Sequence, residues 1–176
     1  MRFLIDSLVK LSRLESGILT LNPRPEALQA MLDEVCGQFA SRARDRGLAL
    51  RVDPTAARAC FDRRWTAEAL GNLVDNALKY TPSGGVTISA AEYELFTRID
   101  VADTGIGVAE SEQAKIFSRF YRSESARDSE GVGIGLFLAR EILSGEGGYI
   151  RLRSAPGQGS TFSVFLPRPA QFFQNR

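Results

Sequence analysis

The sequence predicts an α+β domain: a two-layer α/β sandwich in which a mixed sheet carries helices on one face, preceded by an N-terminal helix. Segments with apolar residues at helical spacing alternate along the chain with shorter segments in which apolar and polar residues alternate. An Asn-Pro-Arg-Pro stretch at residues 22–25 separates the first helical segment from the others. With 176 residues, of which 44% are hydrophobic, the chain can bury one core.

The first segment, residues 1–21, carries leucine and isoleucine at alternating three- and four-residue steps, which predicts an amphipathic helix with a narrow apolar seam. One helix cannot bury such a seam alone. It either docks on the following domain or pairs with a second copy, and the spacing slightly favours self-association into a homodimer. Because Pro23 and Pro25 remove backbone donors and disfavour helix, we interpret residues 23–25 as a linker.

The remaining elements follow from the two periodicities. Helices are predicted over 26–46, with Gly47 placed to end the helix, and over 68–80, 110–117 and 134–143. Strands are predicted over 48–52, 58–61, 86–91, 96–102, 149–153 and 161–166. Residues 118–130 are polar and rich in Arg and Ser, so we expect a mobile loop there.

Composition excludes several classes of function. The net charge of +1 gives no electrostatic basis for nucleic-acid binding, and no signal peptide or bilayer-spanning apolar run is present. Cys36 and Cys60 do not make a disulfide framework, and we expect reduced, partly buried thiols in the cytoplasm. The chain contains no histidine, which excludes His-based acid–base chemistry, His-activated nucleophiles and His-ligated zinc within it.

The helix predicted over 68–80 has two unlike faces. Aliphatic side chains gather on one side, whereas the other side carries Glu68, Asn72, Asp75, Asn76 and Lys79. Carboxylates, amides and an ammonium of this kind can hold a hydrated metal ion and the phosphates that it carries. A solvated polar face is the plain alternative. Two asparagines four residues apart in mid-helix argue against it, because Asn competes for backbone hydrogen bonds.

Two glycine-rich stretches follow this helix. The sequence D-T-G-I-G at 103–107 ends a predicted strand, where glycines allow a ligand to approach the backbone and the carboxylate can accept a hydrogen bond from an exocyclic amine. The sequence G-V-G-I-G-L at 131–136 precedes an apolar helix, where N–H groups and the helix dipole favour phosphate. No βαβ unit surrounds these glycines and no Gly-Lys-Ser/Thr follows, so the site is neither a dinucleotide fold nor a P-loop.

Between the glycine stretches, residues 116–122 combine aromatic and basic side chains. Phe117 and Phe120 are three residues apart, and we expect them to anchor a short helix. Arg119 and Arg122 are suited to bidentate contact and can reach phosphate if the loop closes.

These motifs resemble the catalytic, ATP-binding domain of bacterial sensor histidine kinases, within the superfamily that also contains gyrase-type, mismatch-repair and chaperone ATPases. The matching motifs are Glu68-x-x-x-Asn72-x-x-x-Asn76 (asparagine box), Asp103-x-Gly105-x-Gly107 (first glycine box), Phe117-x-x-Phe120 (phenylalanine box), Gly131-x-Gly133-x-Gly135-Leu136 (second glycine box) and the hairpin ending at 157–167. They occur in the family's order over about residues 26–167, and the resemblance implies the Bergerat-type ATP-binding fold.

The resemblance implies a role for each matching residue. Asn72 and Asn76 would hold Mg²⁺ and the triphosphate of ATP, and Asp103 would accept a hydrogen bond from the adenine amino group. Glu68 occupies the position where family members carry a polarising or general-base side chain, so that Glu68 and Asn72 are the implied catalytic residues. Further nucleotide contacts would come from Lys79, Tyr80, Gly105, Gly107, Arg122, Gly131, Gly133, Gly135, Leu136 and Thr161. Asp75 is expected to make a structural hydrogen bond or salt bridge instead.

The sequence L-S-R-L-E-S-G at 11–17 resembles the end of the second helix of the dimerisation and phosphoacceptor hairpin. The implied organisation is hairpin helix (1–22), linker (23–25), catalytic domain (26–168) and tail (169–176). The acceptor histidine would lie on a helix outside this sequence, so we expect the chain to bind Mg-ATP without phosphorylating itself on histidine. Implied partners are the hairpin of the full-length kinase and a response regulator, with a cytoplasmic location beneath a membrane anchor.

Two departures from the family pattern are Ile134, where Leu is usual, and Glu146, where a histidine often precedes the Gly-Gly pair; neither falls in the implied site.

Two other functions share these motifs. One is an ATP-hydrolysing clamp of the gyrase or chaperone kind, which needs a transducer domain. The other is a nucleotide-binding regulator or scaffold without kinase activity. The hairpin-like stretch at 11–17 favours the histidine kinase.

Overall fold

The structure is a computed structural model that describes residues 2–16, 20–123 and 133–169. Its main layer is a five-stranded sheet in the order β2-β4-β5-β7-β6. The strands are β2 (Ala49–Val52), β4 (Gly85–Glu92), β5 (Phe96–Asp103), β6 (Tyr149–Ser154) and β7 (Ser160–Pro167). The β2–β4 pair is parallel and the other pairs are antiparallel, so the sheet is mixed, as predicted.

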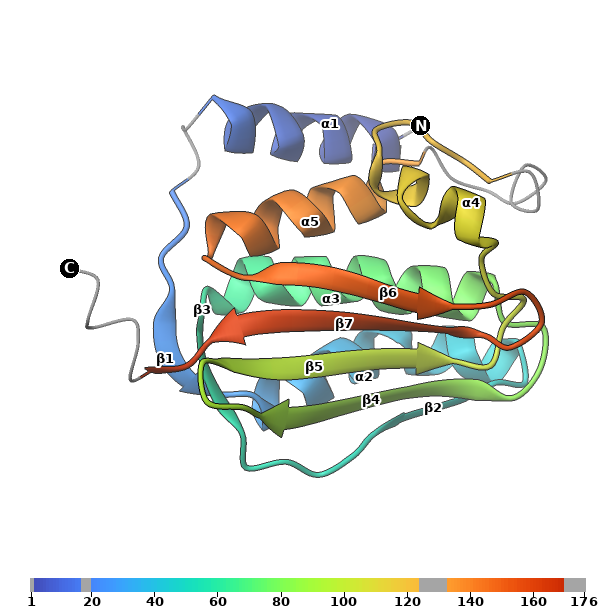
Figure 1. Cartoon of the computed structure of the whole chain (residues 1–176), viewed down its shortest axis with the longest axis horizontal. Coiled ribbons are helices and arrows are strands. Elements are labelled where there is room, and N and C mark those ends of the chain that lie inside the picture. Colours follow the sequence, from blue (N-terminus) through green and yellow to red (C-terminus); the bar gives the residue numbers. More distant parts are fainter. Residues whose placement is uncertain (1, 17–19, 124–132, 170–176) are drawn as a thin grey trace.

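Three long helices cover one face of this sheet (Figure 1): α2 (Gln29–Asp45), α3 (Arg63–Lys79) and α5 (Gly135–Gly145). Aliphatic side chains from the two layers meet between them and form one core, which includes Val35, Leu73, Ile99, Leu138 and Val164. The predicted two-layer sandwich is therefore confirmed. None of the helices in the described ranges is both long and apolar enough to span a membrane.

A second, two-stranded sheet was not predicted. Strand β1 (Arg24–Ala27) pairs antiparallel with β3 (Arg58–Phe61). Arg24 and Pro25, which were interpreted as linker, therefore lie in a strand. A two-stranded ribbon tolerates proline because one side of each strand needs no donor. Helix α2 begins at Gln29 because β1 occupies the residues before it.

Two other predicted helices differ in extent. Helix α1 spans Arg2–Glu15, which is shorter than the predicted 1–21, and residues 17–19 lie outside the described part. The predicted helix over 110–117 is two short pieces, α4 (Glu110–Gln113) and the 3-10 helix η1 (Lys115–Phe117). Most of the loop predicted over 118–130 also lies outside the described residues.

The ends of the long helices follow from their capping residues. Helix α3 begins five residues earlier than predicted because Asp62 caps it: Oδ1 accepts from the N–H groups of Arg64 (3.1 Å) and Trp65 (3.3 Å). Helix α2 ends just before Gly47, as predicted, and this glycine adopts the left-handed conformation that closes a helix (φ 66°). Both cysteines are unpaired thiols, with Cys60 buried and Cys36 partly buried, as predicted.

The uncovered face of the sheet is aromatic and basic. Tyr149 and Phe165 stack with 4.5 Å between ring centres, and the Arg151 guanidinium lies over both rings. Arg151 and Arg153 are exposed on β6, which forms one edge of the sheet, and the four-residue β2 forms the other.

Helix α5 ends at a buried carboxyl group. Glu146 is 2% exposed, and its Oε1 accepts from the N–H of Asp62 at 2.8 Å. The Thr66 hydroxyl donates to the same carboxyl group at 2.8 Å. Burial raises the pKa of Glu146 to about 7, although these hydrogen bonds oppose the rise, and the charge of Asp62 adds to it. This carboxyl group ties the end of α5 to the start of α3.

We expect the free energy of unfolding to fall as pH rises from about 4.5 to about 7. The folded chain holds the Glu146 proton up to pH about 7, whereas the unfolded chain releases it near the ordinary value of 4.5, so the unfolded state binds fewer protons across this window. The contribution is on the order of 2–3 kcal/mol. Urea unfolding at about pH 5 and about pH 8 should show a smaller loss for Glu146→Gln than for wild type.

Glu94→Gln, in the exposed β4–β5 turn, is the matched control and should lose as much stability as wild type. An equal loss in Glu146→Gln and wild type would contradict the assignment of this titration to Glu146.

Candidate functional site

The segments predicted to form the site lie at one end of the domain, at the right in Figure 1: the C-terminal ends of α3 and β5 and the N-terminal end of α5. The N–H of Ile106, just after β5, donates to the Tyr80 carbonyl at the end of α3 (3.1 Å). Gly135, at the start of α5, lies so close to α3 that a Cβ there would be 3.1 Å from Asn72 Oδ1. The motifs therefore converge in space.

Helix α3 presents the two faces that its sequence predicts. Leu70 and Leu73 are buried in the core, whereas Asn72 and Asn76 lie half-buried, one turn apart. The Asn72 Nδ2 atom is buried and has no hydrogen-bond partner within the described part of the chain. Leaving a buried amide unpaired costs about 1–3 kcal/mol, so this atom marks a place where a polar ligand fits.

Strand β5 ends at Asp103, whose side chain lies on the helix-covered side of the sheet. Its Oδ1 accepts from the N–H groups of Gly105 (2.8 Å) and Ser160 (3.2 Å). Both hydrogen bonds that the described residues make to this carboxylate end on Oδ1, so Oδ2 can accept from a ligand. Burial raises the pKa of Asp103, and the two backbone hydrogen bonds offset part of that rise.

The first glycine box packs against the protein's own backbone. A Cβ on Gly105 would lie 2.5 Å from the Tyr80 carbonyl oxygen, so no side chain fits. Gly107 has φ 72°, and the Ala155 carbonyl oxygen occupies the place of its Cβ. The space that these glycines provide is therefore used to hold the end of β5 against α3 and against the β6–β7 turn.

The second glycine box lies partly outside the described residues. The Gly133 carbonyl accepts from the N–H of Phe120 (3.0 Å), which joins the two chain ends that flank residues 124–132. Gly131 lies in that segment, and its phosphate contact stays a prediction. Leu136 is half-buried and packs against the core at the start of α5.

The cationic and aromatic residues that were predicted to contact the nucleotide lie near the C-terminal end of α3 and the N-terminal end of α5. The Lys79 Nζ atom is 5.4 Å from the ring centre of the half-buried Tyr80, a cation–π contact at the end of α3. Arg122 is half-buried, at the last described residues before 124–132. The Arg119 guanidinium lies over the ring of Phe137 in α5 (4.6 Å).

The two phenylalanines of the phenylalanine box differ. Phe117 is buried and meets the Phe162 ring edge-on, with 6.1 Å between ring centres, as expected of a helix anchor. Phe120 is 58% exposed and has φ 61°, so the prediction that it anchors the same helix is wrong. A left-handed backbone cannot continue a right-handed helix.

Thr161 is not brought to this site. It pairs with Ala102 across the β5–β7 ladder, and it lies on the uncovered face of the sheet, opposite to Asp103. The residue that lies beside Asp103 is its neighbour Ser160, which is buried. Alternation along the last strand, with Phe162 pointing into the core, is the signal in the sequence that identifies Ser160.

Glu68 and Asp75 both have cationic partners. The Glu68 Oε1 atom lies 2.7 Å from Nζ of Lys10 in α1, a contact that no local pattern predicts because the residues are 58 positions apart. Asp75 forms an ion pair with Arg42 of α2, which confirms its predicted structural role.

Comparison with known proteins agrees with this geometry. Residues 61–170 match the family described as histidine kinase-, DNA gyrase B- and HSP90-like ATPase. The chain is 32% identical to sensor protein SrrB of Staphylococcus aureus (strain MRSA252) over 175 residues, which cover 94% of this chain and 29% of SrrB. The chain thus spans less than a third of the length of the curated relatives that it matches.

Solved structures give the same result. Full-length ShkA in complex with AMPPNP superposes with a TM-score of 0.82 and 27% identity, over 93% of this chain and 35% of ShkA. The nucleotide-free catalytic domain of histidine kinase ThkA superposes with a TM-score of 0.73 and 26% identity, over 84% of this chain and 96% of that domain. This chain therefore belongs to the family of histidine kinase-, DNA gyrase B- and HSP90-like ATPases, as an ATP-binding catalytic domain of the sensor histidine kinase type.

Proposed function

We propose that this chain donates the γ-phosphoryl group of Mg-ATP to a histidine on a separate helical hairpin, as the catalytic module of a sensor histidine kinase. The observation that carries the proposal is the buried Asn72 amide, which has no hydrogen-bond partner in the described part of the chain and lies beside Gly135 at the start of α5. An amide, a carboxylate and a helix N-terminus are the groups that a metal-bound adenine nucleotide needs.

Asp103 would select the base. Two backbone N–H groups hold its Oδ1, which leaves Oδ2 oriented before any ligand arrives. That oxygen would accept from the exocyclic amine of adenine. Guanine carries a carbonyl oxygen at the corresponding position, so two acceptors would face each other, and we expect ATP to bind more tightly than GTP.

Asn72 and Asn76 would hold Mg²⁺ and the triphosphate, since Oδ1 of an amide suits a hard cation and Nδ2 can donate to a phosphate oxygen. Backbone N–H groups at Gly133 and Gly135, together with those predicted at Gly131, would bind phosphate at the start of α5. Lys79 and Arg122 would add positive charge, with Tyr80 against the base. When bound, Mg²⁺ neutralises charge on the triphosphate.

The chain would then act by positioning. Glu68 lies on the same face of α3 as Asn72 and would take the N–H proton of the acceptor imidazole as its other nitrogen attacks the γ-phosphorus. The bond from the γ-phosphorus to the β–γ bridging oxygen would break, and ADP would leave with that oxygen. Because this chain has no histidine, the acceptor must come from another segment.

The proposed partners are that phosphoacceptor hairpin and a response regulator that receives the phosphoryl group. Residues 1–22 would be the end of the hairpin's second helix, followed by the catalytic domain up to residue 168. Ile5, Leu8 and Val9 are exposed on α1, which supports pairing with another helix, including that of a second copy. Similarity to a protein named as a sensor supports a place in a signal-sensing protein, and we propose that this chain is its cytoplasmic part, beneath a membrane anchor.

Calorimetric titration with ATP and GTP, with and without Mg²⁺, tests the nucleotide site, and a histidine-bearing hairpin added with γ-labelled ATP tests the transfer. We expect selective Mg-ATP binding, acid-labile label on the hairpin and none on this chain alone. Steady ATP hydrolysis without any acceptor would favour the clamp ATPase instead.

Asp103→Asn should weaken ATP binding by about tenfold or more while leaving the fold intact. The asparagine oxygen can still accept from Gly105 and Ser160, but its NH₂ group would then face the adenine amine, donor against donor. Calorimetry measures the affinity, and circular dichroism the fold.

Asp100→Asn is the matched control, because Asp100 lies on the same strand but on the uncovered face, where it binds Arg98 and Ser163. It should bind ATP like wild type. Unchanged affinity in Asp103→Asn would remove Asp103 from the base site.

Asn72→Leu should separate stability from function. The side chain keeps its size but loses the unpaired amide, so we expect the free energy of unfolding to stay constant or to rise by about 1 kcal/mol. Mg-ATP affinity should fall by about tenfold or more, and the dependence of binding on Mg²⁺ should disappear. Urea unfolding and calorimetry with and without Mg²⁺ measure the two effects.

The control is Asp75→Asn, on the side of α3 that meets α2, which should keep Mg-dependent binding. Wild-type Mg-ATP affinity in Asn72→Leu would show that this amide does not hold the metal-bound triphosphate.

A further inference from the structure

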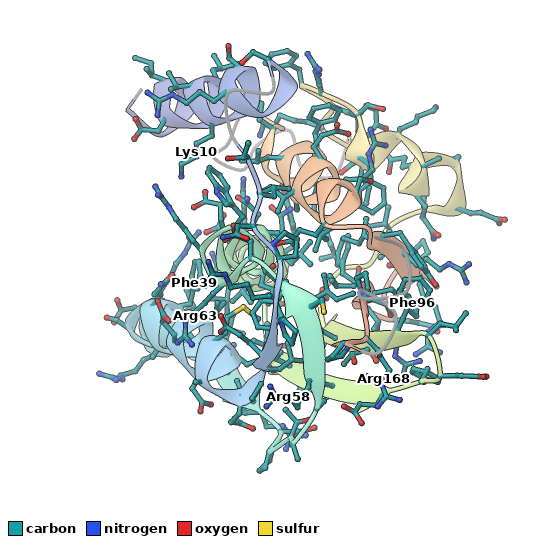
Figure 2. The ribbon with its side chains drawn as sticks, turned by 90° about the vertical axis from the view of Figure 1, so that its left-hand side faces the viewer. Lys10, Phe39, Arg58, Arg63, Phe96 and Arg168 are labelled. Carbon is teal, nitrogen blue, oxygen red and sulfur yellow. The ribbon has the colours of Figure 1, made fainter. Side chains whose placement is uncertain are left out.

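Three strands of the main sheet place Asp103 in a row with two serines. Asp103, at the end of β5, is directly opposite Ser160 at the start of β7, and Ser160 is directly opposite Ser154 at the end of β6. Side chains that are directly opposite each other across antiparallel strands lie on the same face of the sheet, with about 4.5–5.5 Å between their Cβ atoms. Figure 2 views the domain from the other end of these strands, where Phe96 begins β5, so the row lies at the far end. Both serines are therefore neighbours of the carboxylate that is proposed to bind the base.

The Ser154 hydroxyl group makes three hydrogen bonds. Its Oγ lies 2.8 Å from the Gly159 carbonyl oxygen and 2.9 Å from Oγ of Ser160. The N–H of Val108 donates to the same oxygen at 2.8 Å. A hydroxyl group has one proton to donate and two lone pairs that accept, so these three contacts use its whole capacity.

The three contacts also fix which of the two serine hydroxyl groups donates to the other. A carbonyl oxygen can only accept, so the proton of Ser154 must lie on the bond to Gly159. The bond between the two hydroxyl oxygens then needs the proton of Ser160. Ser160 is 8% exposed, and with its single proton directed to Ser154, its oxygen can only accept from any further group.

Ser154 is itself held in place by α4. Nε2 of Gln113 donates to the Ser154 carbonyl at 2.9 Å and to the Val108 carbonyl at 3.1 Å, which uses both protons of the amide. Val108 directly follows Gly107 of the first glycine box, and both of its backbone polar groups are bound by Ser154 or Gln113. Rotation of the Ser154 side chain would break all three bonds of its hydroxyl group, so this group has one well-defined orientation.

We propose that Ser154 is a positioning residue that determines base specificity: it holds the Ser160 hydroxyl proton away from the base, so that Ser160 and Asp103 both present acceptors. The inference rests on the proposed function, because it deepens the choice of base assigned to Asp103. Adenine carries an exocyclic amine with two N–H groups, which two acceptors can bind. A base with a carbonyl oxygen in that place would face two acceptors and find no donor.

Calorimetric titration of the whole chain with the magnesium complexes of ATP and inosine triphosphate tests the inference. The base of inosine triphosphate has a carbonyl oxygen in place of the adenine amine and lacks the second amine of guanine. In Ser154→Ala the Ser160 proton is free to turn and donate to that oxygen. We expect the ratio of ATP affinity to inosine triphosphate affinity to fall by roughly three- to tenfold, the range for one neutral hydrogen bond. Inosine triphosphate should bind more tightly, whereas a merely loosened fold would weaken both nucleotides.

Three further variants show whether the effect passes through Ser160. Ser154→Thr keeps the hydroxyl group and should retain the wild-type ratio. Ser160→Ala should weaken ATP binding by roughly three- to tenfold without improving that of inosine triphosphate, and adding Ser154→Ala to it should not change the ratio further. Ser163→Ala is the matched control, because Ser163 lies on β7 but on the uncovered face, where it donates to Asp100 (2.6 Å). It should bind both nucleotides like wild type.

The possible results separate this inference from the proposed function. A folded Ser154→Ala variant with the wild-type ratio would overturn the inference, and so would an equal fall of the ratio when Ser160 is already alanine. If circular dichroism shows that Ser154→Ala does not fold, Ser160→Ala decides, and unchanged ATP affinity in that variant would overturn the inference. Failure of the wild-type chain to bind Mg-ATP would overturn the proposed function, and this inference with it.

Discussion

Helix α3 is the constraint on which the rest of the structure depends, because one helix supplies both the centre of the core and the polar side chains of the site. Burial of Leu70 and Leu73 between sheet and helices fixes the rotation of α3 about its axis. That rotation places Asn72 beside Gly135 at the start of α5. Aliphatic packing in the core thus decides where the Asn72 amide lies. The cap at Asp62 decides where the helix begins.

The same end of the domain carries features that oppose stability. The Asn72 Nδ2 atom is buried without a hydrogen-bond partner among the described residues, and Asp103 is a half-buried carboxylate whose pKa is raised by burial. A sequence selected for folding alone would replace both with apolar groups. The proposed nucleotide would give a partner to the Asn72 amide and to Oδ2 of Asp103, whereas Oδ1 of Asp103 already accepts from Gly105 and Ser160.

Much of the architecture could be predicted because it depends on local periodicity: the order of helices and strands, the end of α2 and the two faces of α3. Strand β1 was missed because Pro25 resembles a linker residue and its partner strand lies far along the chain. Thr161 was chosen from a motif match, whereas alternation along the strand identifies Ser160. The pairing of Lys10 with Glu68 depends on how two distant helices pack, and no short-range pattern encodes that.

The two edge strands of the main sheet, β2 and β6, affect how copies of the domain can associate. Unpaired backbone groups on an edge strand can pair with a strand of a neighbouring chain. In this domain one edge strand, β2, has only four residues, and the other, β6, carries the exposed Arg151 and Arg153, and both features disfavour such pairing. Encounters between copies are thereby directed away from the sheet and towards the helical side, where Ile5 and Val9 lie exposed. Copies of this domain at high local concentration can then meet often without joining edge to edge through their sheets.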